Sequence, residues 1–207
     1  ERMNHFWKTV SIGTVLSVGA IFAGCSVINR SAGRGTNVVP KTDPVTAKTG
    51  TAIGDTAPNF QLASIGGASI SLADLRDQPA VLVFWTAWCP VCKEEAPRFN
   101  QLAAQYEPRG VRVLGINIQD SLARTESGIK DFGIRYTVVR DADASVARLY
   151  KVVGTPTIVI LDRQGNVRYF GNELPSDYPA LFDTLIQTRP TLYRRMSDAT
   201  CYIPGLI

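Results

Sequence analysis

The chain of 207 residues is long enough for one domain of ordinary size with additional segments. Its net charge of +4 is too weak and too scattered to indicate a nucleic-acid partner, and an apolar content of 45% excludes wholesale disorder. The single histidine is His5, which excludes Ser-His-Asp catalysis, Cys-His catalysis and histidine-dependent zinc or copper sites from everything that follows it.

Residues 1–24 have the composition of a targeting segment rather than of a folded domain. Arg2 and Lys8 precede an uncharged run of fifteen residues, from Val10 to Gly24, which is the order found in a secretory signal. The run is shorter than the roughly 20 residues that a membrane-spanning helix needs. We expect a signal peptide here, with an uncleaved membrane anchor as the alternative.

The apolar run ends in Phe22-Ala23-Gly24-Cys25, which resembles the lipobox of bacterial lipoproteins, although leucine is usual where Phe22 stands. In such proteins the cysteine is acylated and becomes the first residue of the mature chain. The resemblance implies that Cys25 carries lipid and that the protein is membrane-anchored in a periplasmic or other extracytoplasmic compartment. Residues 25–51 are rich in Gly, Ser, Thr, Asn and Pro, so we expect a flexible tether after the lipidated cysteine.

Strands and helices alternate between residues 52 and 187, where we expect the folded domain. Gly66-Gly67 predicts a hairpin between Asn59–Ala63 and Ala68–Leu72. The continuous apolar run Ala80–Trp85 predicts a buried central strand. A helix is predicted from about Cys89, with Phe99, Leu102, Ala103 and Tyr106 on one face. The other predicted elements are a strand Val111–Ile118, a helix Leu122–Phe132, a strand Thr137–Arg140, a helix Ser145–Tyr150, strands Thr157–Leu161 and Val167–Phe170, and a closing helix over Tyr178–Ile186. This order indicates an α/β layer fold with a mixed sheet.

The strongest local signal is Trp88-Cys89-Pro90-Val91-Cys92-Lys93, placed where the helix after Ala80–Trp85 begins. Two cysteines with this spacing can close a disulfide ring and open it again. Free N–H groups and the positive end of the helix dipole stabilise the thiolate of the first cysteine. We therefore expect Cys89 to be the exposed nucleophile and Cys92, one turn deeper, to be the resolving thiol.

Two other uses of this cysteine pair are open from the residues alone. A zinc site needs four ligands, and after His5 only Cys25 and Cys201 could join the pair, so we expect no metal. A purely structural disulfide would gain little stability from closing so short a loop. The pattern thus favours a redox-active Cys89–Cys92 disulfide that needs no further cofactor.

Together with Pro97, this cysteine motif resembles the active-site helix of thioredoxin, and Gly154-Thr155-Pro156-Thr157 resembles the cis-proline loop of that fold. Residues 53–187 are more closely similar to the membrane-anchored TlpA/ResA/CcmG-type thiol–disulfide oxidoreductases of bacteria. The supporting stretches are Gly54–Phe60, Leu72–Leu75, Phe84–Cys89 and Asp162–Gly165. The resemblance implies a thioredoxin fold with a central mixed β-sheet flanked by helices, an N-terminal β-hairpin and the TlpA-type central insertion, a strand and a helix, at Asp120–Tyr136.

The same resemblance implies which residues meet the substrate. Trp88 and Pro90 would contact it beside the cysteines. In the resembled fold, Pro156 faces the two sulfurs, and the backbone of Thr155 pairs with an extended substrate segment. From the residues alone, Pro156 could equally be an ordinary turn proline.

A buried acid distinguishes this group from thioredoxin. The position of the thioredoxin aspartate is Val83 in this chain, whereas the ResA and CcmG groups carry a glutamate three residues after the second cysteine, which is Glu95 here. That spacing places Glu95 one helical turn from Cys92 on the same side. We expect it to take the proton of the resolving thiol. The alternative is a solvated first-turn acid, as we expect for Glu94.

The predicted function is an extracytoplasmic protein-disulfide oxidoreductase whose partners are protein disulfides or dithiols. The resemblance implies a reductant that a membrane electron donor of the DsbD/CcdA type recharges, and several relatives of this kind serve cytochrome c maturation. Residues 188–207 are expected to form a tail beyond the fold, in which Cys201 is incidental to the chemistry. A free thiol, an intermolecular disulfide or a regulatory partner is the alternative for Cys201.

Two alternative functions belong to other classes. The spacing in Thr86-Ala87-Trp88-Cys89 matches that of the peroxiredoxins, whose fold is related to thioredoxin, but Leu82 stands where they have a proline. A non-enzymatic binding module, such as a copper chaperone of thioredoxin fold, would need Cys-x-x-x-Cys and a distant histidine, and the chain has neither.

Overall fold

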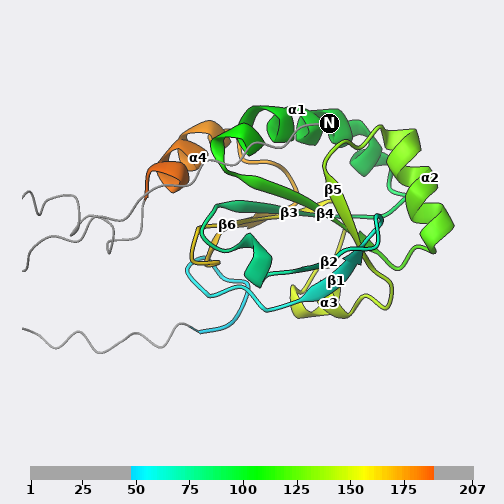
Figure 1. Cartoon of the computed structure of the whole chain (residues 1–207), viewed down its shortest axis with the longest axis horizontal. Helices are drawn as coiled ribbons and strands as arrows, with labels where there is room; N and C mark the ends of the chain where they lie inside the picture. The colour runs from blue at the N-terminus through cyan, green and yellow to red at the C-terminus, as the bar shows by residue number, and fades with distance from the viewer. Residues whose placement is uncertain (1–47, 189–207) are drawn as a thin grey trace, which may run out of the picture. The chain divides into compact units, whose positions relative to one another are not determined.

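A seven-stranded mixed sheet forms the centre of the structure, a computed structural model that describes residues 48–188 (Figure 1). The predicted signal peptide or anchor, Cys25 and Cys201 lie outside the described residues. From residue 48 to residue 188, every helix is too short or too polar to cross a bilayer.

The strand order across the sheet is β2-β1-β5-β4-β3-β6-β7. Strands β3, β4 and β5 run parallel, and the remaining neighbours are antiparallel. The centre is buried on both faces, which explains the continuous apolar runs of β3 and β6. The strands are β1 (Gln61–Ser64), β2 (Ser69–Ser71), β3 (Ala80–Trp85), β4 (Arg112–Ile118), β5 (Thr137–Asp141), β6 (Thr157–Leu161) and β7 (Val167–Gly171).

Helices cover both faces of the sheet (Figure 1). Residues Val81, Val83 and Trp85 of β3 pack against α1 and α4 on one face. Leu82 and Phe84 alternate with them and pack with residues of α3 and of the segment before β1 on the other face. The helices are α1 (Pro90–Tyr106), α2 (Leu122–Phe132), α3 (Ser145–Leu149) and α4 (Tyr178–Gln187), with short 3₁₀ turns at Ala73–Leu75 and Glu107–Arg109.

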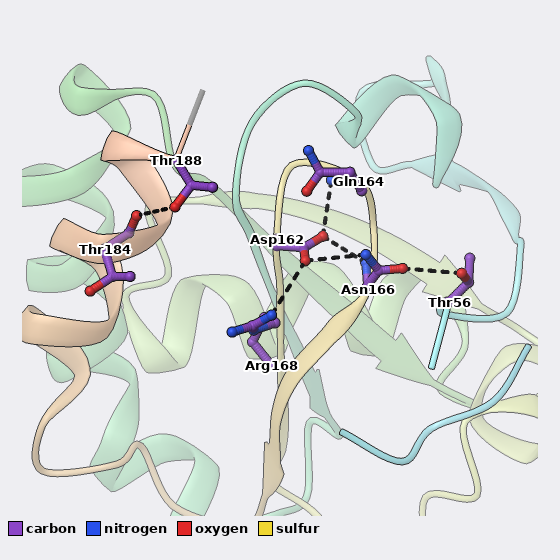
Figure 2. A network of polar contacts seen from close by, with 7 residues as sticks. All are labelled: Thr56, Asp162, Gln164, Asn166, Arg168, Thr184 and Thr188. Atoms are coloured by element: carbon purple, nitrogen blue, oxygen red, sulfur yellow. Dashed lines mark hydrogen bonds and ion pairs between the residues drawn. The ribbon is translucent and has the colours of Figure 1, made fainter. Parts of the chain in front are cut away.

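The turn between β6 and β7 is organised by one carboxylate (Figure 2). Asp162 Oδ1 accepts hydrogen bonds from the backbone N–H groups of Gln164 and Asn166, both at 2.9 Å. The Asn166 side chain in turn accepts a hydrogen bond from Thr56 Oγ1 at 3.1 Å. These contacts fasten the segment before β1 to the β6–β7 hairpin.

Backbone hydrogen bonds strengthen the same attachment. Gly54 N donates to Val167 O, and Val167 N donates to Asp55 O, both at 2.8 Å. Leu161, at the end of β6, lies opposite Ala80 at the start of β3. The hairpin turn therefore lies at the edge of the sheet where β3 begins, which is the edge opposite to the cysteines.

The structure confirms the predicted α/β class, the mixed sheet with flanking helices and the N-terminal hairpin of β1 and β2. One detail of the expected insertion differs. Asp120–Tyr136 contributes α2 but no strand, because the chain turns at Gly133 with a φ of 64° and buries Ile134 and Tyr136 before β5 begins at Thr137.

Candidate active site

Strand β3 and helix α1 place the cysteine pair at the edge of the sheet where β3 ends. Cys89 is the N-cap residue of α1, and Pro90 begins the helix, a position where its missing N–H costs nothing. Cys89 and Cys92 form a disulfide with their Cα atoms 5.2 Å apart. The backbone N–H of Cys92 donates to Cys89 Sγ at 3.1 Å, so the helix N-terminus points a donor at the first sulfur.

The expectation that Cys89 is exposed is wrong for this disulfide form. Cys89 and Cys92 are only 4% and 5% exposed, because Cys89 Sγ lies against the Thr155 carbonyl oxygen at 3.4 Å. The exposed apolar side chains beside the pair are those of Trp88, Pro90 and Val91. Exposure does not distinguish the two cysteines, whereas the helix cap does, since the Cys92 N–H contacts only the first sulfur.

The loop before β6 supplies the other wall of the site. The Thr155–Pro156 peptide bond is cis, as the motif predicts, and Pro156 is buried beside Cys92. Asn172 Nδ2 donates to the Pro156 carbonyl at 2.8 Å and fixes the loop from the end of β7. Asn172 could not be predicted from the sequence, because no local pattern links it to a loop sixteen residues earlier.

Apolar and aromatic side chains surround Cys92 on its inner side. Val83 lies among them at the position of the thioredoxin aspartate, so no carboxylate faces Cys92 from that strand position. Burial raises the pKa of Tyr136, so this wall stays uncharged even at alkaline pH where a free tyrosine would ionise. The residues that line this wall with Cys92 are Val83, Trp85, Phe99, Phe132, Ile134, Tyr136 and Pro156.

The structure distinguishes the two acids that follow the cysteine pair. Glu94 is exposed, whereas Glu95 is half-buried on the first turns of α1. Glu95 Oε2 lies 3.5 Å from Arg98 Nη1, which is ion-pair distance. The same oxygen is buried and lacks hydrogen-bond geometry to any donor. The contact is therefore a loose ion pair, and Glu95 Oε2 accepts no hydrogen bond.

The two residues on which the peroxidase alternative depends, Thr86 and Leu82, lie in the interior of the fold. Thr86 is buried, and its hydroxyl has no hydrogen-bond partner. Leu82, which replaces the proline of that pattern, is fully buried in β3. In the described part of the chain, no three His, Cys, Asp or Glu side chains are grouped to hold a metal ion.

The AhpC/TSA family model matches residues 53–170, which is more than half of the chain. The chain is 34% identical over 123 residues to the thiol-disulfide oxidoreductase ResA of Geobacillus thermodenitrificans, covering 59% of this chain and 71% of that protein. It is 32% identical over 114 residues to ResA of Bacillus subtilis, covering 55% of this chain and 64% of that protein.

Solved structures give the same result. A secreted Mycobacterium tuberculosis disulfide oxidoreductase, homologous to Escherichia coli DsbE, superimposes with a TM-score of 0.52 at 30% identity, over 61% of this chain and 93% of that one. A candidate thiol:disulfide interchange protein DsbE from Chlorobium tepidum superimposes with a TM-score of 0.58 at 28% identity, over 65% of this chain and 95% of that one.

Proposed function

The chain belongs to the AhpC/TSA family and, within it, to the ResA-like thiol–disulfide oxidoreductases, and from this premise we propose that it reduces the disulfides of other proteins outside the cytoplasm. One observation carries the proposal. The Cys89–Cys92 disulfide lies at the N-terminus of α1, against the Thr155–Pro156 loop, with exposed Trp88 and Val91 around it. A buried redox pair with an apolar rim suits a protein substrate better than a small polar one.

The first step forms a mixed disulfide. The Cys89 thiolate attacks one sulfur of the substrate disulfide, the substrate S–S bond breaks, and the released thiolate takes a proton from water. The Cys92 N–H, 3.1 Å from Cys89 Sγ in the disulfide form, stabilises negative charge on that sulfur. The exposed rim of Trp88, Pro90 and Val91 and the backbone of Thr155 hold the substrate segment during this step.

The second step releases the reduced substrate. The Cys92 thiol gives its proton to Glu95, and the resulting thiolate attacks Cys89 Sγ. The Cys89–Cys92 disulfide forms as the bond between Cys89 and the substrate breaks. The second substrate sulfur leaves as a thiolate and takes a proton from water, and Glu95 returns its proton to water, so two electrons pass to the substrate. Support for Glu95 as the proton acceptor comes from its half-buried position one turn after Cys92 and from its Oε2, which accepts no hydrogen bond and has only the ion-pair contact with Arg98 at 3.5 Å.

Turnover needs a dithiol that reduces the Cys89–Cys92 disulfide again. A membrane electron donor of the DsbD/CcdA class would supply it if Cys25 carries lipid or residues 1–24 stay as an anchor. Cytochrome c maturation is the client pathway that the ResA and CcmG resemblance implies. Support for an extracytoplasmic site comes from the signal-like composition before residue 25 and from the secreted relative in M. tuberculosis.

The reduction of protein disulfides is tested by trapping. Cys92→Ser blocks the second step, so a scrambled, disulfide-containing protein should accumulate as a mixed disulfide with Cys89. Cys89→Ser should form no such adduct and should lose turnover. An assay with hydrogen peroxide in place of the protein disulfide tests the peroxidase alternative, which the unpartnered Thr86 hydroxyl leaves as the second candidate. Fast oxidation of Cys89 by peroxide without mixed-disulfide trapping would overturn the proposal.

The role of Glu95 is tested with its neighbour as a matched control. Glu95→Gln should slow the release of reduced substrate by about tenfold or more and should flatten the pH profile of that step. Glu94→Gln, one residue earlier and exposed, should change neither. The direction of electron flow is tested by the equilibrium of the Cys89–Cys92 couple with glutathione. A potential near that of strong oxidants would contradict a reducing function.

A further inference from the structure

A buried polar cluster lies where β4 ends, beside the loop that carries the cysteines. Its members are Asn117, Asp120 and Thr125, which are 0%, 4% and 0% exposed. Asn117 of β4 lies opposite Trp85, the last residue of β3. The parallel ends of β3 and β4 therefore bring the cluster next to the loop between Trp85 and Cys89.

One carboxylate oxygen connects the cluster to that loop. Asp120 Oδ2 accepts a hydrogen bond from the backbone N–H of Ala87 at 2.7 Å and a second from Asn117 Nδ2 at 2.9 Å. Thr125 Oγ1, on α2, lies 2.7 Å from Asn117 Oδ1. The hydroxyl thus orients the Asn117 amide, and the amide orients the carboxylate toward Ala87.

Ala87 is the residue through which this contact reaches the chemistry. It lies two residues before Cys89, inside the turn closed by the hydrogen bond from Cys89 N to Thr86 O at 3.2 Å. A shift of Ala87 would move that turn, and with it the distance of 3.1 Å between Cys89 Sγ and the Cys92 N–H.

A second observation places α2 against the same residue. A Cβ atom added to Gly128 would lie 2.8 Å from Ala87 Cβ and 3.2 Å from Ala87 Cα. The backbone of α2 therefore lies so close to the loop between Trp85 and Cys89 that only a glycine fits at position 128 without displacing a neighbour. Asp120 and Gly128 contact Ala87 from the two ends of one segment, which indicates that this segment fixes the loop.

We propose that Asp120 is a positioning residue for the dithiol: through the Ala87 N–H it holds the Thr86–Cys89 turn so that Cys89 caps α1. Asn117 and Thr125 hold Asp120 in turn. The proposal rests on the proposed use of Cys89 as the attacking thiolate. It extends that function to a carboxylate that does not touch the reacting sulfurs.

The test measures Cys89 itself in the full chain, without a protein substrate. The reduced protein is alkylated with iodoacetamide at fixed pH, and the modification of the Cys89 peptide is followed by mass spectrometry. Asp120→Ala should slow alkylation about tenfold, because the loosened cap stabilises the thiolate less. Asp120→Asn keeps an oxygen acceptor for both donors and should stay within about twofold of the unchanged protein.

Asp162→Ala is the matched control, because it removes a carboxylate that accepts backbone hydrogen bonds at the opposite edge of the sheet. It should leave Cys89 alkylation unchanged. Equal slowing in Asp120→Ala and Asp162→Ala would show a general loss of structure and would overturn the proposal. So would an Asp120→Ala protein whose Cys89 reacts at the unchanged rate. A failure to reduce protein disulfides would instead contradict the proposed function. The alkylation rates of Cys89 would still test the positioning role of Asp120, because they need no protein substrate.

A measurement on the unchanged protein covers the case in which Asp120→Ala does not fold. The Ala87 amide should exchange its hydrogen at least about tenfold more slowly than the amide of neighbouring Trp88, whose residue is 69% exposed. Thr125→Val, which removes only the hydroxyl that orients Asn117, should narrow that difference. Equal exchange at Ala87 and Trp88 in the unchanged protein would overturn the proposal.

Discussion

Asp120 and Asp162 use the same chemistry at opposite ends of the sheet, and the comparison shows how one kind of contact comes to have two functions. Each carboxylate is largely buried and accepts hydrogen bonds from backbone N–H groups. Asp162 bonds to residues two and four positions ahead, within its own turn (Figure 2). Asp120 bonds to Ala87, 33 positions back, in the loop that carries the cysteines.

The separation along the chain between the two bonded residues decides which property changes when the carboxylate is removed. Asp162 stabilises a hairpin turn whose geometry its own sequence already favours, so its loss affects folding alone. Asp120 connects α2 and β4 to a loop from another part of the chain. Its loss therefore affects both the free energy of unfolding and the position of Cys89.

The largest expected difference between Asp120→Ala and Asp162→Ala is in the free energy of unfolding. Asp120→Ala leaves the Ala87 N–H and the Asn117 amide without an acceptor inside the protein, which we expect to cost about 3 kcal/mol of unfolding free energy. Asp162→Ala should cost about 1 kcal/mol, since the turn amides can bond to water instead. Urea unfolding measures both values. Equal losses of unfolding free energy in the two variants would contradict the distinction between Asp120 and Asp162.

A smaller effect is expected where α2 touches the redox loop. Gly128→Ala should lower the unfolding free energy by about 1 kcal/mol net, because crowding against Ala87 outweighs the gain in helix propensity. Gly66→Ala is the control, since only Ser64 Oγ lies near the added Cβ, at 3.8 Å. We expect that control to stay within about 0.5 kcal/mol in the same urea experiment. A higher unfolding free energy in Gly128→Ala would contradict this expectation, because it would show that the loop around Ala87 can move to accommodate the added methyl group.

The smallest effect appears only at alkaline pH and concerns the wall behind Cys92. Burial raises the pKa of Tyr136 above its ordinary value of 10.0, so the folded protein keeps the phenol neutral when the unfolded chain ionises it. The stability that depends on the neutral phenol is present below pH 10 and is lost as the pH rises through the folded pKa. Each such tyrosine contributes a slope of about 1.4 kcal/mol per pH unit.

Tyr136→Phe should therefore flatten the fall of unfolding free energy above pH 10. Tyr150, whose pKa burial also raises, offers the comparison on the other face of the sheet, because its hydroxyl donates to the Pro58 carbonyl at 2.8 Å. Tyr150→Phe should flatten the same slope but also cost about 1 kcal/mol at neutral pH. Denaturant unfolding across pH measures both. If the slope of unfolding free energy against pH is the same in Tyr136→Phe as in the unchanged protein, the folded protein tolerates the Tyr136 phenolate behind Cys92.

Most of the fold was predictable from local sequence. The apolar runs of β3 and β6 are buried on both faces, and α2 ends at Gly133 in the left-handed conformation, as its sequence indicates. The short 3₁₀ turns were not predicted, because three residues are too few to show a hydrophobic periodicity. The cysteine pair and the cis-Pro156 loop were recognisable because each is a contiguous motif.

The rest of the site depends on contacts between distant segments. The hydrogen bonds of Asp120 to Ala87 and of Asn172 to Pro156 arise only once β3, β4, β6 and β7 are in register. The burial of Cys89 follows from the approach of the Thr155 carbonyl, 66 positions away. No spacing rule within one segment predicts such contacts. The sequence therefore indicated the candidate redox pair but not the residues that position it.

The attachment of the segment before β1 to the β6–β7 hairpin has a mechanical consequence. Any tension transmitted along the chain through Lys48 enters the folded part near Thr56, where Thr56 N donates to Lys48 O at 2.9 Å. Gly54, Asp55 and Thr56 pass that load to Val167 and Asn166, at the edge where β3 begins. None of these contacts involves α1, and Cys89 and Cys92 lie at the opposite edge of the sheet, where β3 ends.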